Sequence, residues 1–158
     1  MADLLQLDEN QRSSEDTVKD MYFIFEIDGE DYGVEVAYVS SIVSYFEYKI
    51  TKVPKMPDFI EGIINLRGDL TGVLDVRKRF GKMPKEHDEA TCIVIIMYND
   101  YLLGLIVDSV KSTQTIRSEN VAPPPSVKLN SYNQFIRNIG QTADGVKLLL
   151  DLDRFLEH

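Results

Sequence analysis

The chain has 158 residues, 44% of them hydrophobic, which is enough apolar material for one globular domain or two small ones. Its formal net charge of −9 repels phosphate backbones and anionic lipid surfaces, so no nucleic-acid partner is expected. One cysteine cannot form an internal disulfide, and with only two histidines it is too few for a zinc cluster.

The two ends of the chain lie outside the predicted fold. Residues 1–19 are rich in acidic side chains without a sustained period, which predicts a disordered acidic N-terminal tail. Residues 157–158 resemble the start of an expression tag. No leader peptide is recognisable, and the longest apolar run, 93–97, is far shorter than the roughly 18 to 20 residues that span a bilayer. We therefore expect a cytoplasmic protein that does not insert into membranes.

Residues 20–81 are expected to form a first β-barrel subdomain. Apolar residues alternate on both sides of Asp28-Gly29, a dipeptide that favours a tight turn, and this pattern predicts a β-hairpin. The segment 36–43 carries valines at helical spacing, which predicts a helix of about two turns. Alternation over 46–50 predicts a third strand.

Two further strands and a short helix complete this half. The strands flank Arg67-Gly68-Asp69, where Gly and Asp supply turn chemistry. The segment 75–80 begins with Asp, carries basic residues toward its end and is followed by glycine, which is typical of a helix matched to its dipole. The polar run 82–90 contains proline and mixed charges and predicts a linker.

Residues 91–156, the expected second β-barrel subdomain, repeat the order of the first half. Gly104 corresponds to Gly33 at an offset of 71, and Asp151 corresponds to Asp75 at an offset of 76. A duplicated unit of five strands predicts a mainly β protein of two small barrels, intertwined or tightly packed, because one such unit buries too little surface alone. The seam between the barrels is then the expected place for a groove.

The segment 59–81, FIEGIINLRGDLTGVLDVRKRFG, resembles the signature of the CheW family of chemotaxis coupling proteins. The resemblance runs from Phe23 to Leu156, with GEDYGVEVAYVSSIV, GLIVDSV, APPP and LLLDLDRFL in the order and spacing of the family. It implies two SH3-like five-stranded β-barrels in a non-catalytic scaffold. Such an adaptor tethers the histidine kinase CheA, through its regulatory domain, to the cytoplasmic tips of methyl-accepting chemoreceptors in membrane-associated arrays.

The resemblance also implies a receptor-binding groove between the barrels. The residues that carry over to this chain are Val39, Ile42, Asn65, Arg67 and Gly68. The kinase contact is implied at the ends of the barrels and is not assigned to individual residues.

Three positions depart from the family's pattern. Ser41 stands where Glu is common, Gly72 where Pro is frequent, and Asn138 where a turn usually has Gly. A charged receptor contact therefore does not carry over to Ser41. A CheV-like coupling domain, or another SH3-like barrel that binds a ligand, is the alternative that these motifs leave open.

Purely structural interpretations of the same residues also stand. Arg67 fits a solvated turn, and Val39 and Ile42 belong to an apolar stripe of a kind that usually forms core. Asp75 and Asp151 match as helix starts and are not expected to form an acid/base pair. The glycines occur at turns and form no phosphate-binding or dinucleotide-binding motif, so neither a cofactor nor enzymatic activity is expected.

Overall fold

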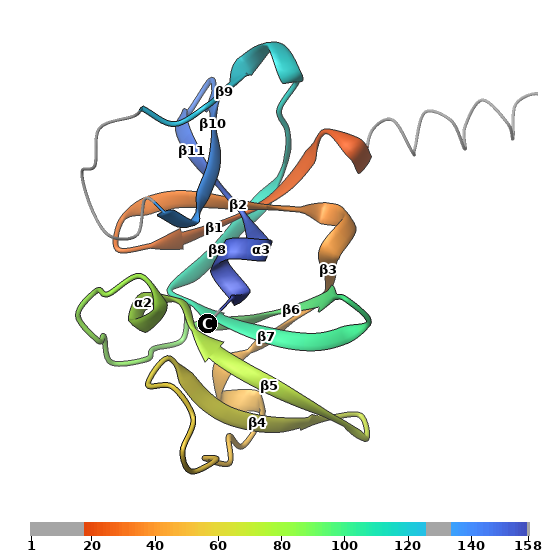
Figure 1. Ribbon diagram of the computed structural model, residues 1–158, viewed down its shortest axis with the longest axis vertical. Coiled ribbons are helices and arrows are strands. Elements are labelled where there is room, and N and C mark those ends of the chain that lie inside the picture. The colour runs from red at the N-terminus through yellow and green to blue at the C-terminus, as the bar shows by residue number, and fades with distance from the viewer. Residues whose placement is uncertain (1–17, 126–133, 158) are drawn as a thin grey trace, which may run out of the picture.

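The computed structural model describes residues 18–125 and 134–157, and the strands in these residues form two β-sheets (Figure 1). Nearly all of the predicted tail at 1–19 and part of the proline-containing loop at 122–130 lie outside the described residues. Within the described residues, no helix has the length and apolar character needed to cross a membrane.

The elements of the two sheets are as follows. Sheet A has the order β8-β1-β2-β11-β10-β9, with bounds Ser109–Thr115, Met21–Ile27, Glu30–Glu35, Gly145–Leu150, Ile136–Thr142 and Val121–Ala122. Sheet B has the order β3-β6-β7-β5-β4, with bounds Val39–Ser44, Cys92–Tyr98, Tyr101–Val107, Asp69–Asp75 and Ile60–Leu66. The helical elements are η1 (Val36–Tyr38), η2 (Tyr45–Glu47), α2 (Val76–Arg79), η3 (Ser118–Asn120) and α3 (Leu152–Leu156).

The two halves of the chain exchange their hairpins. β1 and β2 of the first half lie in sheet A, whereas β6 and β7 of the second half lie in sheet B. Replacing every strand of sheet B by its counterpart in the other half gives β8-β1-β2-β11-β10, which is the order in sheet A. The predicted mainly β, duplicated fold is confirmed, in its intertwined form. The ranges 20–81 and 91–156 therefore describe the sequence repeat and do not coincide with the sheets.

Matching glycines lie at the parallel contact between the halves in each sheet. Gly33 of β2 pairs with Leu149 of β11, and Gly104 of β7 pairs with Val73 of β5. A Cβ at Gly33 would lie 2.8 Å from the Leu149 side chain, and one at Gly104 would lie 2.7 Å from Ile93. Both distances are too short for carbon atoms in contact. At Gly33 a side chain would therefore press on Leu149 of the other half, whereas at Gly104 it would press on Ile93 of the neighbouring strand β6.

The predicted helix at 36–43 and the predicted strand at 46–50 are wrong. One 3-10 turn, η1, leads directly into β3, and 46–50 forms no strand. β3 pairs with β6 through an irregularity between Val39 and Ser41, where a bulge displaces the register. Val39 then lies opposite Ile96, and Ile42 lies opposite Val94, so both project on one face of the sheet. A bulged strand thus reproduces the three-residue spacing that a helix would give.

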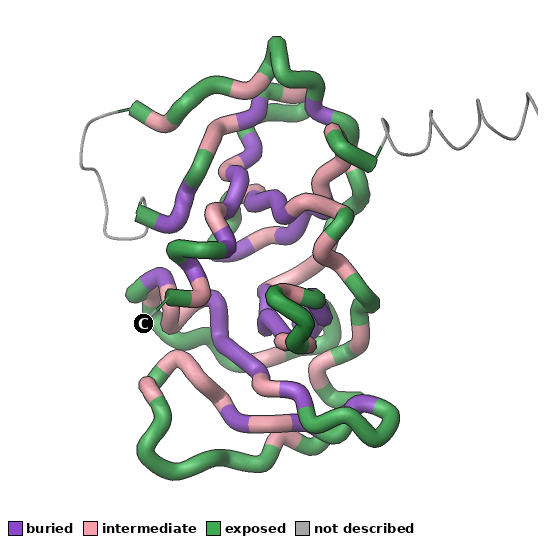
Figure 2. The backbone as a smooth tube through the Cα atoms, turned by 45° about the vertical axis from the view of Figure 1, so that its right-hand side comes forward, coloured by how far each residue is buried: buried purple, intermediate pink, exposed green. Residues whose placement is uncertain are grey.

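The larger core lies between the two sheets. It includes Phe25 and Val34 of sheet A together with Val94 and Leu105 of sheet B. A second cluster, which includes Ile64, fills the opposite face of sheet B. Figure 2 shows the buried segments along the strands and the exposed ones at the turns and connections. The apolar strands β6 and β7 are buried on both faces because they lie between these two cores.

The helices α2 and α3 begin in the same way. The Asp75 carboxylate accepts a hydrogen bond from the backbone N–H of Lys78, and the Asp151 carboxylate accepts one from Arg154, both at 3.3 Å. These are N-cap interactions that satisfy a free N–H group of the first turn. The prediction that the two aspartates mark matching helix starts is confirmed.

Candidate docking site between the sheets

The internal repeat creates two equivalent seams between the sheets. At seam 1, α2 meets the β1–β2 turn and the corner between β7 and β8 (left in Figure 1). At seam 2, α3 meets η1 and the end of β6. The repeat offsets relate three residues of seam 1 to three of seam 2: Arg77 to Asp153, Asp108 to Ala37, and Asp28 to Asn99.

Seam 1 is closed by a cluster of charged side chains around Arg77. The Arg77 guanidinium donates to both carboxylate oxygens of Asp108, with Nε to Oδ1 at 2.8 Å and Nη2 to Oδ2 at 2.9 Å. It also donates to Asp28 Oδ1 at 3.3 Å and to the Met83 carbonyl at 2.8 Å. The backbone N–H of Asp28 completes the cluster by donating to Asp108 at 2.8 Å. We call Arg77, Asp108 and Asp28 the clamp.

The pKa shifts of Arg77 and Asp108 agree with the geometry of the clamp. The hydrogen bond to Asp108 raises the pKa of the Arg77 guanidinium. Burial alone would raise the pKa of the Asp108 carboxyl, but the hydrogen bonds from Arg77 and from the Asp28 backbone hold that pKa below its usual value. The side chains of Arg77 and Asp108 are each only 13% exposed, so solvent screens this bidentate pair less than a surface ion pair.

Seam 2 has an open hollow at the position equivalent to the clamp. The hollow has a volume of about 30 Å³, room for a water molecule or the tip of one side chain. Its lining residues are Val34, Glu35, Tyr38, Tyr98, Arg137, Leu150, Leu152 and Asp153. The rings of Tyr38 and Tyr98 contact each other with centroids 5.8 Å apart. Two aromatic rings thus line seam 2 next to Ala37 and Asn99, the equivalents of two clamp residues.

An exposed apolar strip continues from seam 2 across sheet B. Tyr98 on β6 lies opposite Tyr101 on β7 across their hairpin turn. The parallel register of β7 with β5 then places Leu70 beside Tyr101, two residues before the pair Gly72 and Leu103. Leu70 is 73% exposed and Tyr101 is 72% exposed. Large apolar side chains that open to solvent side by side indicate a surface for a partner.

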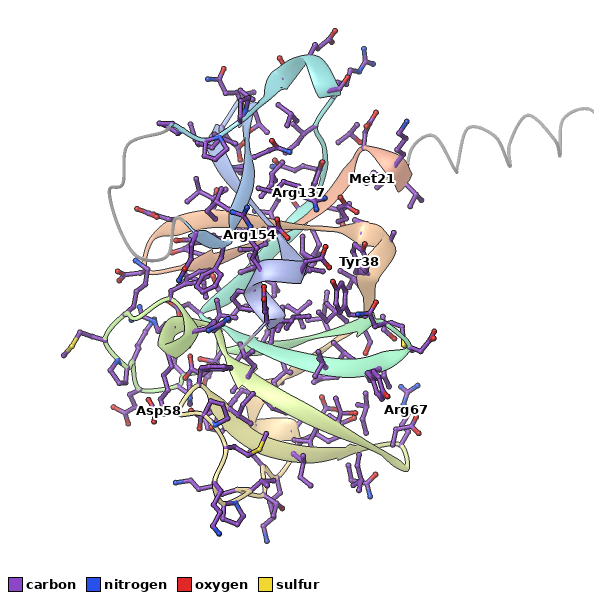
Figure 3. All side chains as sticks on the ribbon, in the orientation of Figure 1. Met21, Tyr38, Asp58, Arg67, Arg137 and Arg154 are labelled. Atoms are coloured by element: carbon purple, nitrogen blue, oxygen red, sulfur yellow. The ribbon has the colours of Figure 1, made fainter. Side chains whose placement is uncertain are left out.

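The β4–β5 turn borders this strip. Arg67 and Gly68 occupy the turn with φ angles of 53° and 91°, which is the left-handed conformation of a tight hairpin. Asn65 stabilises the turn because its Oδ1 accepts a hydrogen bond from Gly68 N at 2.8 Å. Arg67 is exposed, and Figure 3 shows it on the same side of the molecule as Tyr38. The sequence-predicted residues Asn65, Arg67 and Gly68 are therefore brought together.

The two remaining predicted residues lie on β3. Val39 is partly buried against the core between the sheets and follows Tyr38 directly. Ile42 shares the sheet face of Val39 and is 42% exposed, but it lies three residues farther from the β6–β7 turn. Val39 therefore borders seam 2, whereas Ile42 is remote from the β4–β5 turn.

Four apolar residues of this region were missed from the sequence: Tyr38, Tyr98, Tyr101 and Leu70. Tyr98 and Tyr101 flank a hairpin turn, and an aromatic pair next to a turn is a usable signal because strand ends are seldom buried. Leu70 follows the Arg67 turn within an apolar strand and carries no separate signal. We call these four residues, Val39 and the turn at 65–68 the docking face.

Comparison with known proteins identifies the family. A model described as the CheW-like domain matches residues 21–158. The chain belongs to the CheW family. It is 31% identical over 134 residues to Chemotaxis protein CheW of Bacillus subtilis, with 85% of each chain covered. It is 32% identical over 134 residues to Chemotaxis protein CheV3 of Helicobacter pylori, covering 80% of this chain and 41% of that protein.

A solved structure supports the same assignment. The scaffolding protein TtCheW from Thermoanaerobacter tengcongensis superimposes with a TM-score of 0.80 at 33% sequence identity, covering 88% of this chain and 93% of that one. The expected fold and family are thereby confirmed, and this CheW-family chain is a coupling adaptor of chemotaxis. Among the described residues, no group of three or more His, Cys, Asp or Glu side chains has the arrangement of a metal site.

Proposed function

We propose that this adaptor couples the histidine kinase CheA to the cytoplasmic tips of chemoreceptors by receiving a receptor helix on the docking face. The observation that carries the proposal is the continuity of the open seam 2 with the exposed strip that ends at the Arg67 turn. The protein has no catalytic role in this proposal. Its effect on the kinase comes from holding kinase and receptor together in a membrane-associated array.

The dimensions of the docking face suit one helix. From β6 to β4 the strip crosses three strand spacings, roughly 14 Å, and a helix with its side chains is about 10 to 12 Å wide. Tyr98, Tyr101 and Leu70 would contact the apolar side of an amphipathic helix. The forked donors of Arg67 would contact a carboxylate or the carbonyl groups at the end of that helix. Val39 borders the face, and Ile42 is its most peripheral candidate contact.

The test uses two baits, a receptor-tip fragment and the isolated regulatory domain of CheA. Arg67→Glu should weaken capture of the adaptor by the receptor tip about tenfold, because it places a carboxylate where the proposed contact needs a donor. Arg117→Glu is the matched control, since Arg117 is also an exposed arginine but precedes η3 near sheet A. Equal capture of the two variants by the receptor bait would refute the proposed site.

A second readout tests the coupling itself. With receptor-bearing membranes and CheA, the wild-type adaptor should raise kinase recruitment and autophosphorylation, and Arg67→Glu should lower both while the protein remains folded. The regulatory-domain bait should capture Arg67→Glu as well as it captures wild type, because the proposed contact of Arg67 is with the receptor helix. If the wild-type adaptor left recruitment unchanged, the coupling function would be refuted.

The alternative, a CheV-like coupling domain, would use the same docking face. The likeness to CheV3 covers 41% of that protein, whereas the B. subtilis CheW is covered over 85% of its length. The similarity therefore covers a larger share of the CheW protein than of the CheV protein, which favours the CheW-type assignment.

A further inference from the structure

The two seams are equivalent in backbone arrangement but not in side chains. Seam 1 is bridged by Arg77, which holds Asp108 at 2.8 Å and Asp28 at 3.3 Å. At seam 2 the equivalent residues are Asp153, which lines the hollow, and Ala37 and Asn99, which each adjoin in sequence a tyrosine that lines it. Without the clamp, a partner helix would find the same backbone arrangement between the sheets at both seams, one on each side of the molecule.

We infer that the clamp makes the adaptor one-sided: Arg77 and Asp108 exclude a partner helix from seam 1 and so direct it to seam 2. This inference rests on the proposed function. Arg77 and Asp108 act here as specificity residues that the partner does not contact. Entry at seam 1 would require the partner to break a bidentate, largely buried ion pair, which costs far more than displacing solvent from the hollow at seam 2.

Three observations support the clamp as a barrier. Arg77 uses its Nε, Nη1 and Nη2 groups within the protein, on Asp108, Met83 and Asp28. Lys82 adds a contact of 3.4 Å to the second Asp28 oxygen. The clamp also joins an element of sheet A, the β1–β2 turn, to α2 and to the β7–β8 corner, so it spans the seam instead of lying on one wall.

The first experiment transplants the clamp to seam 2. Ala37→Asp together with Asp153→Arg changes two exposed residues and copies the pairing of Asp108 with Arg77. The double variant should be captured at least tenfold less by a receptor-tip fragment, while capture by the CheA regulatory domain stays unchanged. The single variants Ala37→Asp and Asp153→Arg are the controls, and the loss should exceed the product of their separate effects. Undiminished capture of the folded double variant would overturn the inference.

The second experiment opens seam 1. In a Cys92→Ser background, photo-crosslinkers are attached to Ala37→Cys at seam 2 or to Met83→Cys at seam 1. The wild-type clamp should give crosslinks to the receptor-tip fragment from position 37 only. Adding Arg77→Asp and Asp108→Ala, which copies the residues of seam 2, should give crosslinks from position 83 as well.

The outcomes separate the two proposals. Crosslinks from position 83 with the clamp intact would overturn the one-sided docking while leaving the adaptor function in place. No crosslink from either position and no capture of wild type would overturn the proposed function and, with it, this inference. If the protein with Arg77→Asp and Asp108→Ala did not fold, capture of the Ala37→Asp, Asp153→Arg variant would still test the inference, because that variant changes only exposed residues.

Discussion

Phe59 and Phe135 both contact one guanidinium group, that of Arg79. The Arg79 Cζ atom is 4.6 Å from the centre of the Phe59 ring and 4.5 Å from the centre of the Phe135 ring. The two phenylalanines are related by the repeat offset of 76, so this contact lies where the two halves meet. Arg79 itself corresponds to Phe155, which is fully buried. Arg79 thus joins the two halves at a position where the second half has a phenylalanine.

Replacing Arg79 should destabilise the protein without touching the docking face. Its Nε donates to the Phe155 carbonyl at 2.8 Å, and Nη2 contacts the carbonyls of Arg154 and Glu157. Arg79→Met removes these bonds and both ring contacts, so the free energy of unfolding should fall by about 3 kcal/mol. Arg79→Lys keeps the charge but loses the planar fork and should cost about half as much. Urea unfolding measures both changes, and equal stability of Arg79→Met and wild type would contradict the argument.

Much of the fold was predictable because its signals are local. The predicted turn at Asp28-Gly29 has positive φ angles, as its residue types predict, and the predicted turn at Arg67-Gly68 also has them, although arginine does not favour this conformation. The exchange of hairpins between the halves was not specified by any local pattern, because strand partners depend on contacts distant in sequence. The bulge after Val39 likewise gives β3 an apolar spacing typical of a helix, and only the pairing with β6 shows that the segment is a strand.

The candidate site was predictable only where turn chemistry or family resemblance marked it. Asn65 and Gly68 were predicted from the family resemblance, and their hydrogen bond explains why these residue types occur in the turn. The exposure of Leu70 and Tyr101 could not be read from the sequence, since apolar residues in strands are buried as a rule. The clamp was also missed, because Arg77 and Asp108 are 31 residues apart and the sequence pattern explained Arg77 as one of the basic residues of a helix matched to its dipole.

Asp31 should matter more to stability than Lys147, although the two form one ion pair. Lys147 is fully buried, and its Nζ lies 2.6 Å from Asp31 Oδ2. Asp31 has a second partner, Lys111, at 2.7 Å, whereas the other partner of Lys147, Asp144, is 62% exposed. Asp31→Asn therefore leaves a buried ammonium poorly paired and should cost about 3 kcal/mol.

The matched variant on the other side of the pair is Lys147→Met. It removes the buried charge and leaves Asp31 paired with Lys111, so it should cost only about 1 kcal/mol. Chemical denaturation of the two single variants at neutral pH tests this order. If Lys147→Met proved the more damaging change, the hydrogen bond and not the buried charge would dominate at this site.

The clamp predicts that Asp108 contributes to stability above, but not below, its titration range. Although burial opposes it, the hydrogen bonds from Arg77 and from the Asp28 backbone leave the folded-state pKa of Asp108 below the ordinary value of 3.8. The unfolded chain therefore binds the proton more tightly, and the stabilisation is present above the ordinary pKa and lost as pH falls through the folded pKa. Asp108→Asn should be less stable than wild type near neutral pH, and this difference should shrink in acid. A difference independent of pH in thermal unfolding scans would contradict the charge-based explanation.

Asp75 predicts the opposite dependence on pH. Its side chain is buried, and burial, followed by repulsion from Glu61, raises its pKa against the opposing hydrogen bond from the Lys78 N–H. Here the folded state binds the proton more tightly, so stability falls as pH rises from the ordinary value of 3.8 through the folded pKa.

Asp75→Asn removes this dependence because the amide cannot ionise, while its oxygen can still accept from Lys78 N at the start of α2. Relative to wild type, Asp75→Asn should therefore become more stable as the pH rises through the window above 3.8, in contrast to Asp108→Asn. Asp151→Asn makes the same change at the equivalent cap of α3 and measures the effect of the amide alone. Thermal unfolding of wild type, Asp75→Asn and Asp151→Asn from acid to neutral pH tests the direction of this change. If the stability of Asp75→Asn relative to wild type declined with rising pH, ionisation of Asp75 would stabilise the folded protein, and the argument would be contradicted.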